Sequence, residues 1–556
     1  MKRTHKLMAL SSACIIMASA LTSCGENATS NYTPHGDTHS NYEYSQSSDE
    51  SSAEEEYYDY AESAEEEGGW NDYYWEEEPE LPSDNEEYHG YSESGFKDPK
   101  AEPLSTFSAD VDTASYTNVR RLLENGNLVP EDSVRIEEFI NYFDYQFPQP
   151  TDDSAFGRYV EIADCPWNAD HKLMMVGIQG QELKEKETPP SNLVFLIDSS
   201  GSMNASDKLP LVQSAFSMLA SELGKHDRIS IVTYASSSEI LLNGAKGTDT
   251  NDIIDALDSI KAGGSTNGEG GIEAAYALAE ENFIKGGNNR VIIATDGDMN
   301  VGASSEDELV KLIESKRDDG IYLSVLGFGT GNYKDARMEA VADCGNGNYS
   351  YIDSEEEAYR VLVGEMSSTL YTIAKDVKIQ VEFNPSQVKS YRLIGYDNRL
   401  MEAEDFLDDT KDAGEIGSGH SVTALYEIEL AKHGDSYHGV QLEFASEHDS
   451  ITDTDDNGRS ELCKLSVAYK TPVNGKNMST SDLYGMESYN NSPSHSMLTA
   501  QCAAEFGMIL RNSEFKGSSD FNQLLELIKN IDIYDDETGK LIDLFNLVET
   551  ASSLYD

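Results

Sequence analysis

A run of five apolar residues that ends at an aspartate constrains this chain more than any other stretch. Residues 193–197 read Leu-Val-Phe-Leu-Ile, the composition of a strand buried on both faces, as in a parallel sheet. Asp198 follows directly, and Ser200 and Ser202 stand on the loop behind it. Ligands of open α/β sheets bind at the carboxyl ends of the strands. The pattern therefore predicts one carboxylate and two hydroxyls at such an edge, and these oxygen ligands suit Mg²⁺ or Mn²⁺.

Two later stretches complete this set. A glycine-rich loop, residues 263–268, carries Thr266 just before a helical pattern, and a second buried strand, residues 291–295, ends at Asp296. Asp-x-Ser-x-Ser, then Thr, then Asp resembles the metal-ion-dependent adhesion site (MIDAS) of von Willebrand factor type A (VWA) domains. The alternative is that Asp198 and Asp296 cap helices or turns of an ordinary doubly wound domain.

The resemblance implies a role for each residue of the site. Asp198, Ser200 and Ser202 would be the loop ligands of Mg²⁺ or Mn²⁺. Thr266 would coordinate directly or through water, and Asp296 would orient a metal-bound water. An acidic side chain of a protein partner would complete the octahedron. The implied activity is binding rather than catalysis.

The charge of the chain limits its partners. Acidic residues number 102 and basic residues 40, which gives a formal net charge of -62. Without a basic surface to neutralise phosphates, nucleic acid is not expected as a partner. The charge favours solubility outside the cell, or attraction of cations and basic surfaces.

The first 24 residues have the form of a lipoprotein signal peptide. A basic start, residues 1–6, precedes the apolar residues 7–21, which are too few for a comfortable membrane span. The ending Leu-Thr-Ser-Cys resembles a bacterial lipobox, which would make Cys24 the lipidated first residue of the mature chain and its membrane anchor. A plain signal peptide is the alternative. The expected location is extracytoplasmic, on the cell membrane or the outer membrane, exposed to periplasm or cell surface.

The sequence changes character along residues 25–103. Glu, Ser, Tyr, Asp and Gly dominate and aliphatic residues nearly vanish, so little apolar surface is available to offset chain entropy. We expect a disordered, self-repelling tether, although its interleaved tyrosines also suit contact with a partner or wall polymer.

Beyond the tether the chain divides by pattern. Alternating strands and helices over residues 189–372 predict a Rossmann-like, doubly wound, mostly parallel sheet, with residues 239–242 as an antiparallel edge. Alternating strands on both sides of it predict a β-sandwich into which this VWA domain is inserted. The predicted divisions are the signal at 1–24, the tether at 25–103, an N-terminal helical module at 104–150, the sandwich at 151–188 and 373–475, the VWA domain at 189–372 and a C-terminal helical region at 476–556.

Two flanking regions carry a second resemblance. Residues 110–116 (Asp-Val-Asp-Thr-Ala-Ser-Tyr), residues 135–143 and the glycine-rich residues 414–426 are similar to segments of a family of bacterial VWA lipoproteins whose C-terminal domain is uncharacterised. Asp110 and Asp112 invite a metal interpretation, but capping and polar packing are favoured because no third ligand is near in sequence.

Other motifs are weaker. Cys165, Cys344, Cys463 and Cys502 are widely spaced and form neither a disulfide framework nor a zinc motif, and their pairing stays open. Residues 453–458 imitate half of an EF-hand loop, yet position twelve is Lys464, so a hairpin turn is favoured.

Three functions fit these features to different degrees. The leading hypothesis is a surface-anchored lipoprotein that binds a protein partner through the metal, in adhesion or another envelope interaction. A scaffold or assembly factor for envelope protein complexes uses the same chemistry. A metal-dependent hydrolase is disfavoured, because no Gly-x-Ser-x-Gly elbow accompanies the serines and the nearest histidine, His226, stands in a polar turn.

The anchor leads to a prediction. Replacing Cys24 with alanine should release the processed protein from the membrane fraction, because no acyl chain would hold it. Cell fractionation and immunoblotting measure this release. A processed, folded variant that stays with the membrane contradicts the lipobox.

Overall fold

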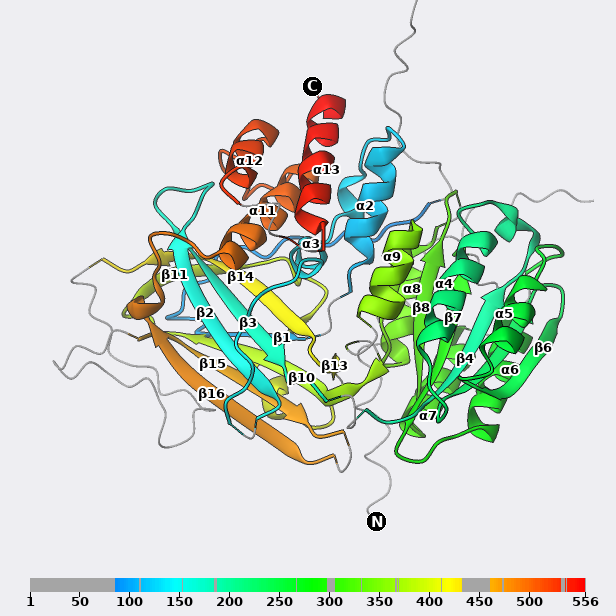
Figure 1. Cartoon of the computed structure of the whole chain (residues 1–556). Coiled ribbons are helices and arrows are strands. Elements are labelled where there is room, and N and C mark those ends of the chain that lie inside the picture. The colour runs from blue at the N-terminus through cyan, green and yellow to red at the C-terminus, as the bar shows by residue number, and fades with distance from the viewer. Residues whose placement is uncertain are drawn as a thin grey trace, which may run out of the picture. The chain divides into compact units, whose positions relative to one another are not determined.

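The computed structural model describes residues 86–555 except 110–111, 153, 185–187, 267, 298–305, 332, 366–367, 369, 412, 433–460, 473–474, 532–535 and 537. Cys24, Asp110 and the EF-hand-like residues 453–458 therefore lie outside the described residues. Figure 1 shows helices gathered around one sheet, and a separate group of long strands with helices against it. No helix of the described part is long and apolar enough to cross a membrane.

The α/β domain is built on a six-stranded sheet in the order β6-β5-β4-β7-β8-β9. All neighbours are parallel except β6, which pairs antiparallel with β5 as predicted for the edge. The strands are β4 (Ser191–Asp198), β5 (Arg228–Tyr234), β6 (Ser238–Lys246), β7 (Asn288–Thr295), β8 (Ile321–Phe328) and β9 (Tyr349–Ile352).

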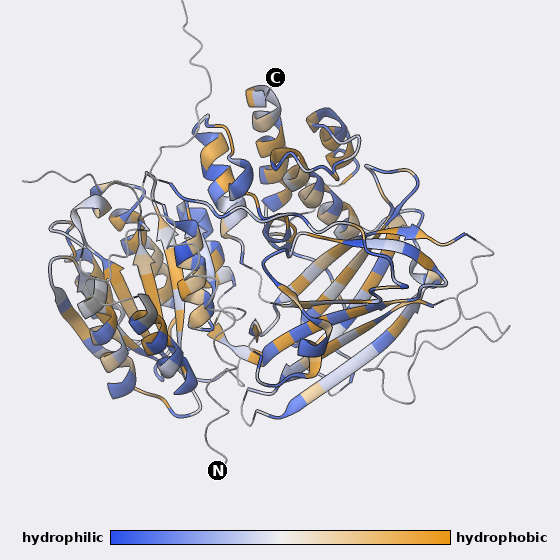
Figure 2. Ribbon diagram, turned by 180° about the vertical axis from the view of Figure 1, so that it is seen from behind, coloured by the Kyte–Doolittle hydropathy of each residue, from blue (hydrophilic) through white to orange (hydrophobic). Residues whose placement is uncertain are grey.

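Helices cover both faces of this sheet because its central strands are apolar on both faces. Leu193, Phe195 and Ile197 pack in one core, and Val194 and Leu196 pack in another. Figure 2 shows these strands as hydrophobic ribbons between more polar helices. The helical segments of the domain are η2 (Gly201–Asn204), α4 (Leu209–Glu222), α5 (Thr250–Asp258), α6 (Gly268–Glu281), α7 (Glu306–Asp318), α8 (Asp335–Cys344), α9 (Glu355–Tyr359) and η3 (Arg360–Gly364).

Strands from both sides of the α/β domain form two antiparallel sheets, as the insertion prediction requires. One has the order β11-β14-β3-β2, and the other has the order β12-β1-β10-β15-β16 with β13 beside β10. Their apolar faces share one core. The strands are β1 (Leu104–Ser108), β2 (Phe156–Asp164), β3 (Lys172–Gly180), β10 (Thr372–Phe383), β11 (Val388–Ile394), β12 (Leu400–Met401), β13 (Ile416–Gly417), β14 (Ser421–Leu430), β15 (Glu461–Lys470) and β16 (Asn477–Gly485).

Two of these strands extend the sandwich beyond the predicted ranges. β1 was assigned to the helical module and β16 to the C-terminal helical region, but both pair with sandwich strands. β1 has only five residues, too few to display alternation, and β16 is a largely polar edge strand. A very short strand such as β1 and a polar edge strand such as β16 both lack the apolar pattern that marks a strand in sequence.

Most of the remaining helices pack together in a fourth core. Helices from the two ends of the chain meet there, for example Phe139 of α3 with Phe506 of α11. The segments are α2 (Ala114–Glu124), η1 (Glu131–Ser133), α3 (Ile136–Asn141), α11 (His495–Leu510), α12 (Phe521–Ile528) and α13 (Lys540–Tyr555). Two short segments lie against sandwich strands instead, η4 (Ala403–Leu407) beside β1 and β10 and η5 (Met486–Ser488) beside β2 and β16. Within the helical module predicted at 104–150, residues 131–141 form a 3₁₀ turn followed by the short α3.

Buried arginines join the α/β domain to the rest of the described chain. Arg135 pairs with Asp335 at the start of α8 and with Glu138. Arg399 pairs with Glu339 of α8 at 3.0 Å. Burial raises the pKa of Glu138 to about 7, although the Arg135 guanidinium opposes that shift. The contacts fix how α8 meets the other segments.

Asp112 has a structural role in the same cluster. Its Oδ1 accepts a hydrogen bond from the backbone N–H of Tyr349 at 2.8 Å, and its Oδ2 pairs with Arg399 at 3.2 Å. The expected polar packing role is therefore confirmed for Asp112. The four described cysteines, Cys165, Cys344, Cys463 and Cys502, are buried and form no disulfide with one another.

This junction predicts a large effect of a single substitution. Asp335→Ala leaves the Arg135 guanidinium buried with one carboxylate partner fewer, which should lower the free energy of unfolding by about 3–5 kcal/mol. Asp318→Ala is the control. Asp318 pairs with Arg317 at 3.4 Å but is 67% exposed, so its loss should cost less than about 1 kcal/mol. Urea unfolding compares them, and equal losses for the two variants contradict the role given to Arg135.

Candidate metal site

Two neighbouring strands deliver a carboxylate each to the same edge of the α/β sheet. β4 ends at Asp198, β7 ends at Thr295 just before Asp296, and the parallel register pairs Ile197 with Ala294. Both carboxylates are buried, Asp198 at 0% exposure and Asp296 at 1%. The structure therefore brings together the two aspartates that the sequence placed at strand ends.

The loop after β4 positions two hydroxyls around Asp198. The backbone N–H of Ser200 donates to Asp198 Oδ1 at 2.8 Å, which closes a tight turn. The hydroxyl oxygens of Ser200 and Ser202 lie 3.0 Å apart and share a hydrogen bond. Thr295 Oγ1 donates to Asp198 Oδ2 at 3.4 Å. The carboxylate is thus oriented by its own loop and by the neighbouring strand.

Ser199 faces away from this pair. Its hydroxyl donates to the carbonyl of Tyr234 at the end of β5, at 3.2 Å, and its backbone N–H donates to the same oxygen at 2.9 Å. Ser199 therefore anchors the loop to β5, whereas Ser200 and Ser202 supply the hydroxyls at the site.

The glycine-rich loop lies against this loop. The N–H of Gly263 donates to the carbonyl of Ser199 at 2.8 Å, and the N–H of Gly201 donates to the carbonyl of Gly264 at 3.1 Å. Gly264 has φ +88°, and a Cβ there would stand 2.7 Å from Ser236 Oγ, so glycine is required. Thr266 follows two residues later and is half-buried, on a loop that is tied to the Asp198 loop.

Lys208 is a site residue that sequence reasoning missed. Its Nζ donates to Asp296 Oδ2 at 2.9 Å from the residue before α4. The other oxygen, Asp296 Oδ1, is buried and has no hydrogen-bond partner among the described residues. The sequence offered one signal for this role, because Lys208 stands close behind the Asp-x-Ser-x-Ser loop of a strongly acidic chain. That signal does not indicate Asp296 as its partner, which is 88 residues away.

The electrostatics of the site favour binding of a cation. Burial raises the pKa of Asp198 to about 6, the N–H of Ser200 opposes that shift, and the charge of Asp296 adds to it. Burial also raises the pKa of the Tyr234 hydroxyl well above its ordinary range, with Asp198 contributing. The charged form of Asp198 is therefore costly until a positive charge stabilises it.

The donor set fits a hard divalent cation. Two carboxylates, the hydroxyls of Ser200 and Ser202 and a nearby threonine are oxygen donors of the kind that Mg²⁺ and Mn²⁺ prefer. The unpartnered Asp296 Oδ1 is the atom that most needs such an ion or its bound water. In the described part of the chain no group of three or more His, Cys, Asp or Glu side chains could hold a metal, so hydroxyls are needed to complete this set.

The geometry does not support the serines as hydrolase nucleophiles with His226 as their base. His226 lies in the turn before β5, at the amino end of that strand, whereas the serines lie at the carboxyl ends. A general base must be within hydrogen-bond reach of the nucleophile it activates. His226 and the serines therefore lie at opposite ends of the strands, too far apart for a hydrogen bond.

Comparison with known proteins identifies the family. Residues 192–365 match the von Willebrand factor type A domain, residues 82–175 match a family described as von Willebrand factor, and residues 368–554 match the C-terminal region of the uncharacterized protein YfbK. YfbK of Escherichia coli (strain K12) is 40% identical over 476 residues, 84% of this chain and 81% of that protein. The chain belongs to the YfbK family. Its α/β domain is a VWA domain, a type of protein-interaction module.

More distant similarity is confined to parts of the chain or to the fold. Inter-alpha-trypsin inhibitor heavy chain H4 of Bos taurus is 29% identical over 150 residues, 26% of this chain and 16% of that protein. Among solved structures, a von Willebrand factor type A protein from Catenulispora acidiphila has a TM-score of 0.40 at 12% identity, covering 72% of this chain and 91% of that one. The ArnB paralog VWA2 from Sulfolobus acidocaldarius has a TM-score of 0.34 at 13% identity, covering 72% and 98%.

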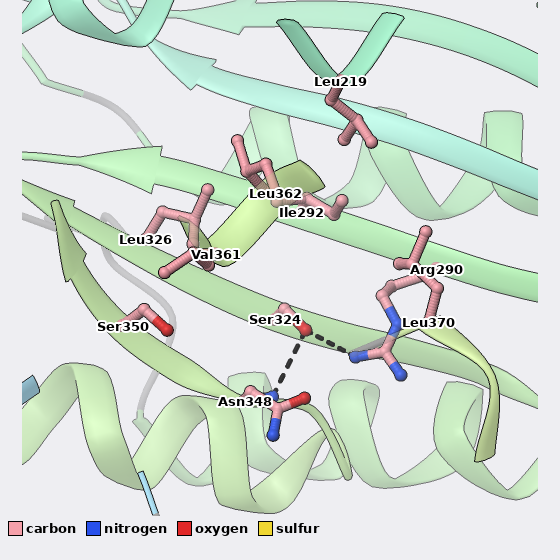
Figure 3. Close-up of a pocket in the computed structure, with 10 residues that line it drawn as sticks. All are labelled: Leu219, Arg290, Ile292, Ser324, Leu326, Asn348, Ser350, Val361, Leu362 and Leu370. Carbon is pink, nitrogen blue, oxygen red and sulfur yellow. Dashed lines mark hydrogen bonds between the residues drawn. The ribbon is translucent and has the colours of Figure 1, made fainter. Parts of the chain in front are cut away.

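A small cavity of the VWA domain lies away from this site. It measures about 20 Å³, close to the space of one water molecule. Figure 3 shows apolar side chains around it, with Arg290 at its edge donating to the hydroxyl of Ser324, which also accepts the N–H of Asn348. Its size and apolar walls make it a packing defect rather than a ligand site.

The burial of Asp198 predicts how the metal-free protein depends on pH. Because the folded-state pKa of about 6 exceeds the unfolded value, folding takes up a proton, and this stabilising contribution is lost as pH rises from about 4 through 6. Asp198→Asn removes the titration. Without metal, the free energy of unfolding of the variant should rise by about 3 kcal/mol relative to that of wild type when the pH is raised from 4 to 8. Urea unfolding in chelator at both pH values measures the gain, and a pH-independent difference contradicts it.

Proposed function

We propose that this YfbK family member binds a protein partner through Mg²⁺ or Mn²⁺ held at the carboxyl edge of its VWA sheet. One observation carries the proposal. Asp198, the hydroxyl pair of Ser200 and Ser202, and the buried Asp296 Oδ1, which has no hydrogen-bond partner among the described residues, lie where β4 and β7 end. Two of these four donors are neutral hydroxyls, which bind the dication without neutralising it further.

The residues of the chain divide the work of holding the ion. Asp198 provides the direct carboxylate and is oriented by the N–H of Ser200. Ser200 and Ser202 provide neutral oxygens, and Thr266 contributes from its tied loop. Asp296 would hold a metal-bound water through Oδ1. When bound, the cation would offer an open coordination position to an acidic side chain of the partner.

The rest of the proposal concerns location. A lipid on Cys24 would anchor the protein outside the cytoplasm, and the acidic residues before Glu86 would hold the folded part away from the membrane by charge repulsion. Residues 86–103, predicted as the end of that tether, belong to the folded part instead, where Glu86 pairs with Arg121 at 2.8 Å and the N–H of Lys97 donates to the carbonyl of Tyr391 at 2.8 Å. An envelope or extracellular protein with an accessible Asp or Glu is the partner chemistry that this arrangement suits. Adhesion and assembly of envelope complexes are both forms of this binding.

The serines provide a matched test of the ion site. Ser200→Ala should weaken Mg²⁺ binding by roughly tenfold or more, because it removes a ligand oxygen. Ser199→Ala should bind as wild type, because the Ser199 hydroxyl is bonded to the Tyr234 carbonyl instead. Asp198→Ala should abolish binding. Isothermal titration calorimetry with Mg²⁺ and with Mn²⁺ measures all four proteins.

The outcome separates the site from the function. No binding by wild type in millimolar metal, or equal binding by wild type and Asp198→Ala, would falsify the ion site. Affinity capture of envelope and extracellular proteins in Mg²⁺ and in chelator then tests the partner. A partner retained equally in both buffers, or by Asp198→Ala, contradicts metal-bridged binding.

A further inference from the structure

A buried lysine already pairs with one of the two carboxylates of the candidate ion site, that of Asp296. The side chain of Lys208 is 9% exposed and its partner carboxylate, Asp296, is 0% exposed. In the cluster of Asp198, Asp296 and Lys208, one positive charge therefore faces two negative ones. A buried ammonium in contact with a buried carboxylate is a strong interaction because water does not screen it.

The fold fixes the path of the Lys208 side chain. The Lys208 N–H donates to the carbonyl of Ala205, and its own carbonyl accepts from Val212 at the start of α4. The side chain then passes over Gly329, just after β8, where a Cβ would lie 2.3 Å from Lys208 Cγ and Cε. Gly329 has φ +71°, and its carbonyl accepts the Tyr351 hydroxyl at 2.7 Å. A side chain at position 329 would collide with the Lys208 side chain.

The ammonium contacts only one oxygen of Asp296. Nζ donates to Oδ2, while Oδ1 is buried without a hydrogen-bond partner among the described residues. The carboxylate is thus held through Oδ2, and Oδ1 is left for a second positive group. Lys208 therefore does not need to leave when an ion arrives.

We propose that Lys208 is a positioning residue that sets the charge of the ion site. It holds Asp296 by Oδ2, lowers the affinity of the site for a free divalent cation, and leaves the loaded site with a net positive charge. The two carboxylates alone would neutralise a dication, whereas with Lys208 one positive charge remains. That charge selects an acidic ligand, which deepens the proposed function and rests on it.

The test compares three proteins as full chains. Lys208→Met removes the charge and keeps the length, and Lys208→Arg keeps the charge. Calorimetry with MgCl₂ or MnCl₂ alone should show Lys208→Met binding the metal roughly tenfold or more tightly than wild type, because a nearby positive charge is gone. Lys208→Arg should bind within about threefold of wild type. A merely structural loss would weaken binding, not strengthen it.

Thermal unfolding gives a second readout. Without metal, Lys208→Met should melt below wild type, because two buried carboxylates lose their counter-charge. In saturating Mg²⁺ the two melting temperatures should converge. If Lys208→Met does not fold without metal, Lys208→Gln, which retains a donor for Asp296, gives the same comparison.

Acetate serves as the smallest carboxylate probe of the loaded site. Displacement of Mn²⁺-bound water by acetate, followed by water proton relaxation, should need several-fold more acetate in Lys208→Met than in wild type. Equal displacement overturns the selection of acidic ligands.

Failures of the two ideas are distinguishable. If wild type and every variant bind no metal, the proposed function fails and Lys208 loses its role with it. If wild type binds metal and Lys208→Met binds it equally or more weakly, the ion site stands and the role of Lys208 is overturned.

Discussion

The pairing of β3 with β14 is the constraint on which the arrangement of the chain depends. Residues 172–179 run antiparallel to residues 421–428, so segments on either side of the VWA domain share one ladder. The N–H of Gly180 donates to the carbonyl of His420 at 2.8 Å, and the N–H of Ser418 donates to the carbonyl of Tyr371 at 2.9 Å. The turn at residues 418–420 is thus hydrogen-bonded both to the segment that leads into the VWA domain and to the segment that leads out of it. The insertion is tolerated because its two ends meet where the sandwich already closes.

Arginine contacts then give the inserted domain one orientation. Arg120 of α2 pairs with Asp353 after β9 at 2.6 Å, and Arg135 and Arg399 reach α8. Removing one partner of such a buried pair is costly, whereas the net gain from forming it is small. We infer that these contacts specify how the domains meet rather than add much stability. They also occupy the carboxylates of α8, so the two aspartates at the ends of β4 and β7 are a separate charge system.

Sequence alone predicted the parts of the structure that periodicity and strand ends encode. Strands buried on both faces, such as residues 193–197, indicate a parallel sheet. Asp198 and Asp296 directly follow two such strands, which predicts that both lie at the carboxyl edge of that sheet. β1 and β16 were missed because short or polar edge strands have no apolar pattern. Lys208 was missed because its place close behind the Asp-x-Ser-x-Ser loop does not indicate its partner, and its contact with Asp296 depends on tertiary packing over Gly329.

The central strand of the VWA domain also defines a path for mechanical load. β4 begins at Ser191, next to the link to the sandwich, and ends at Asp198. It is bonded along its length to β5 on one side and to β7 on the other. A force applied at Asp198 and resisted at Ser191 would run along the covalent backbone of this one strand. The hydrogen bonds to β5 and β7 lie across that direction, so the sheet would not have to open for the strand to carry the load.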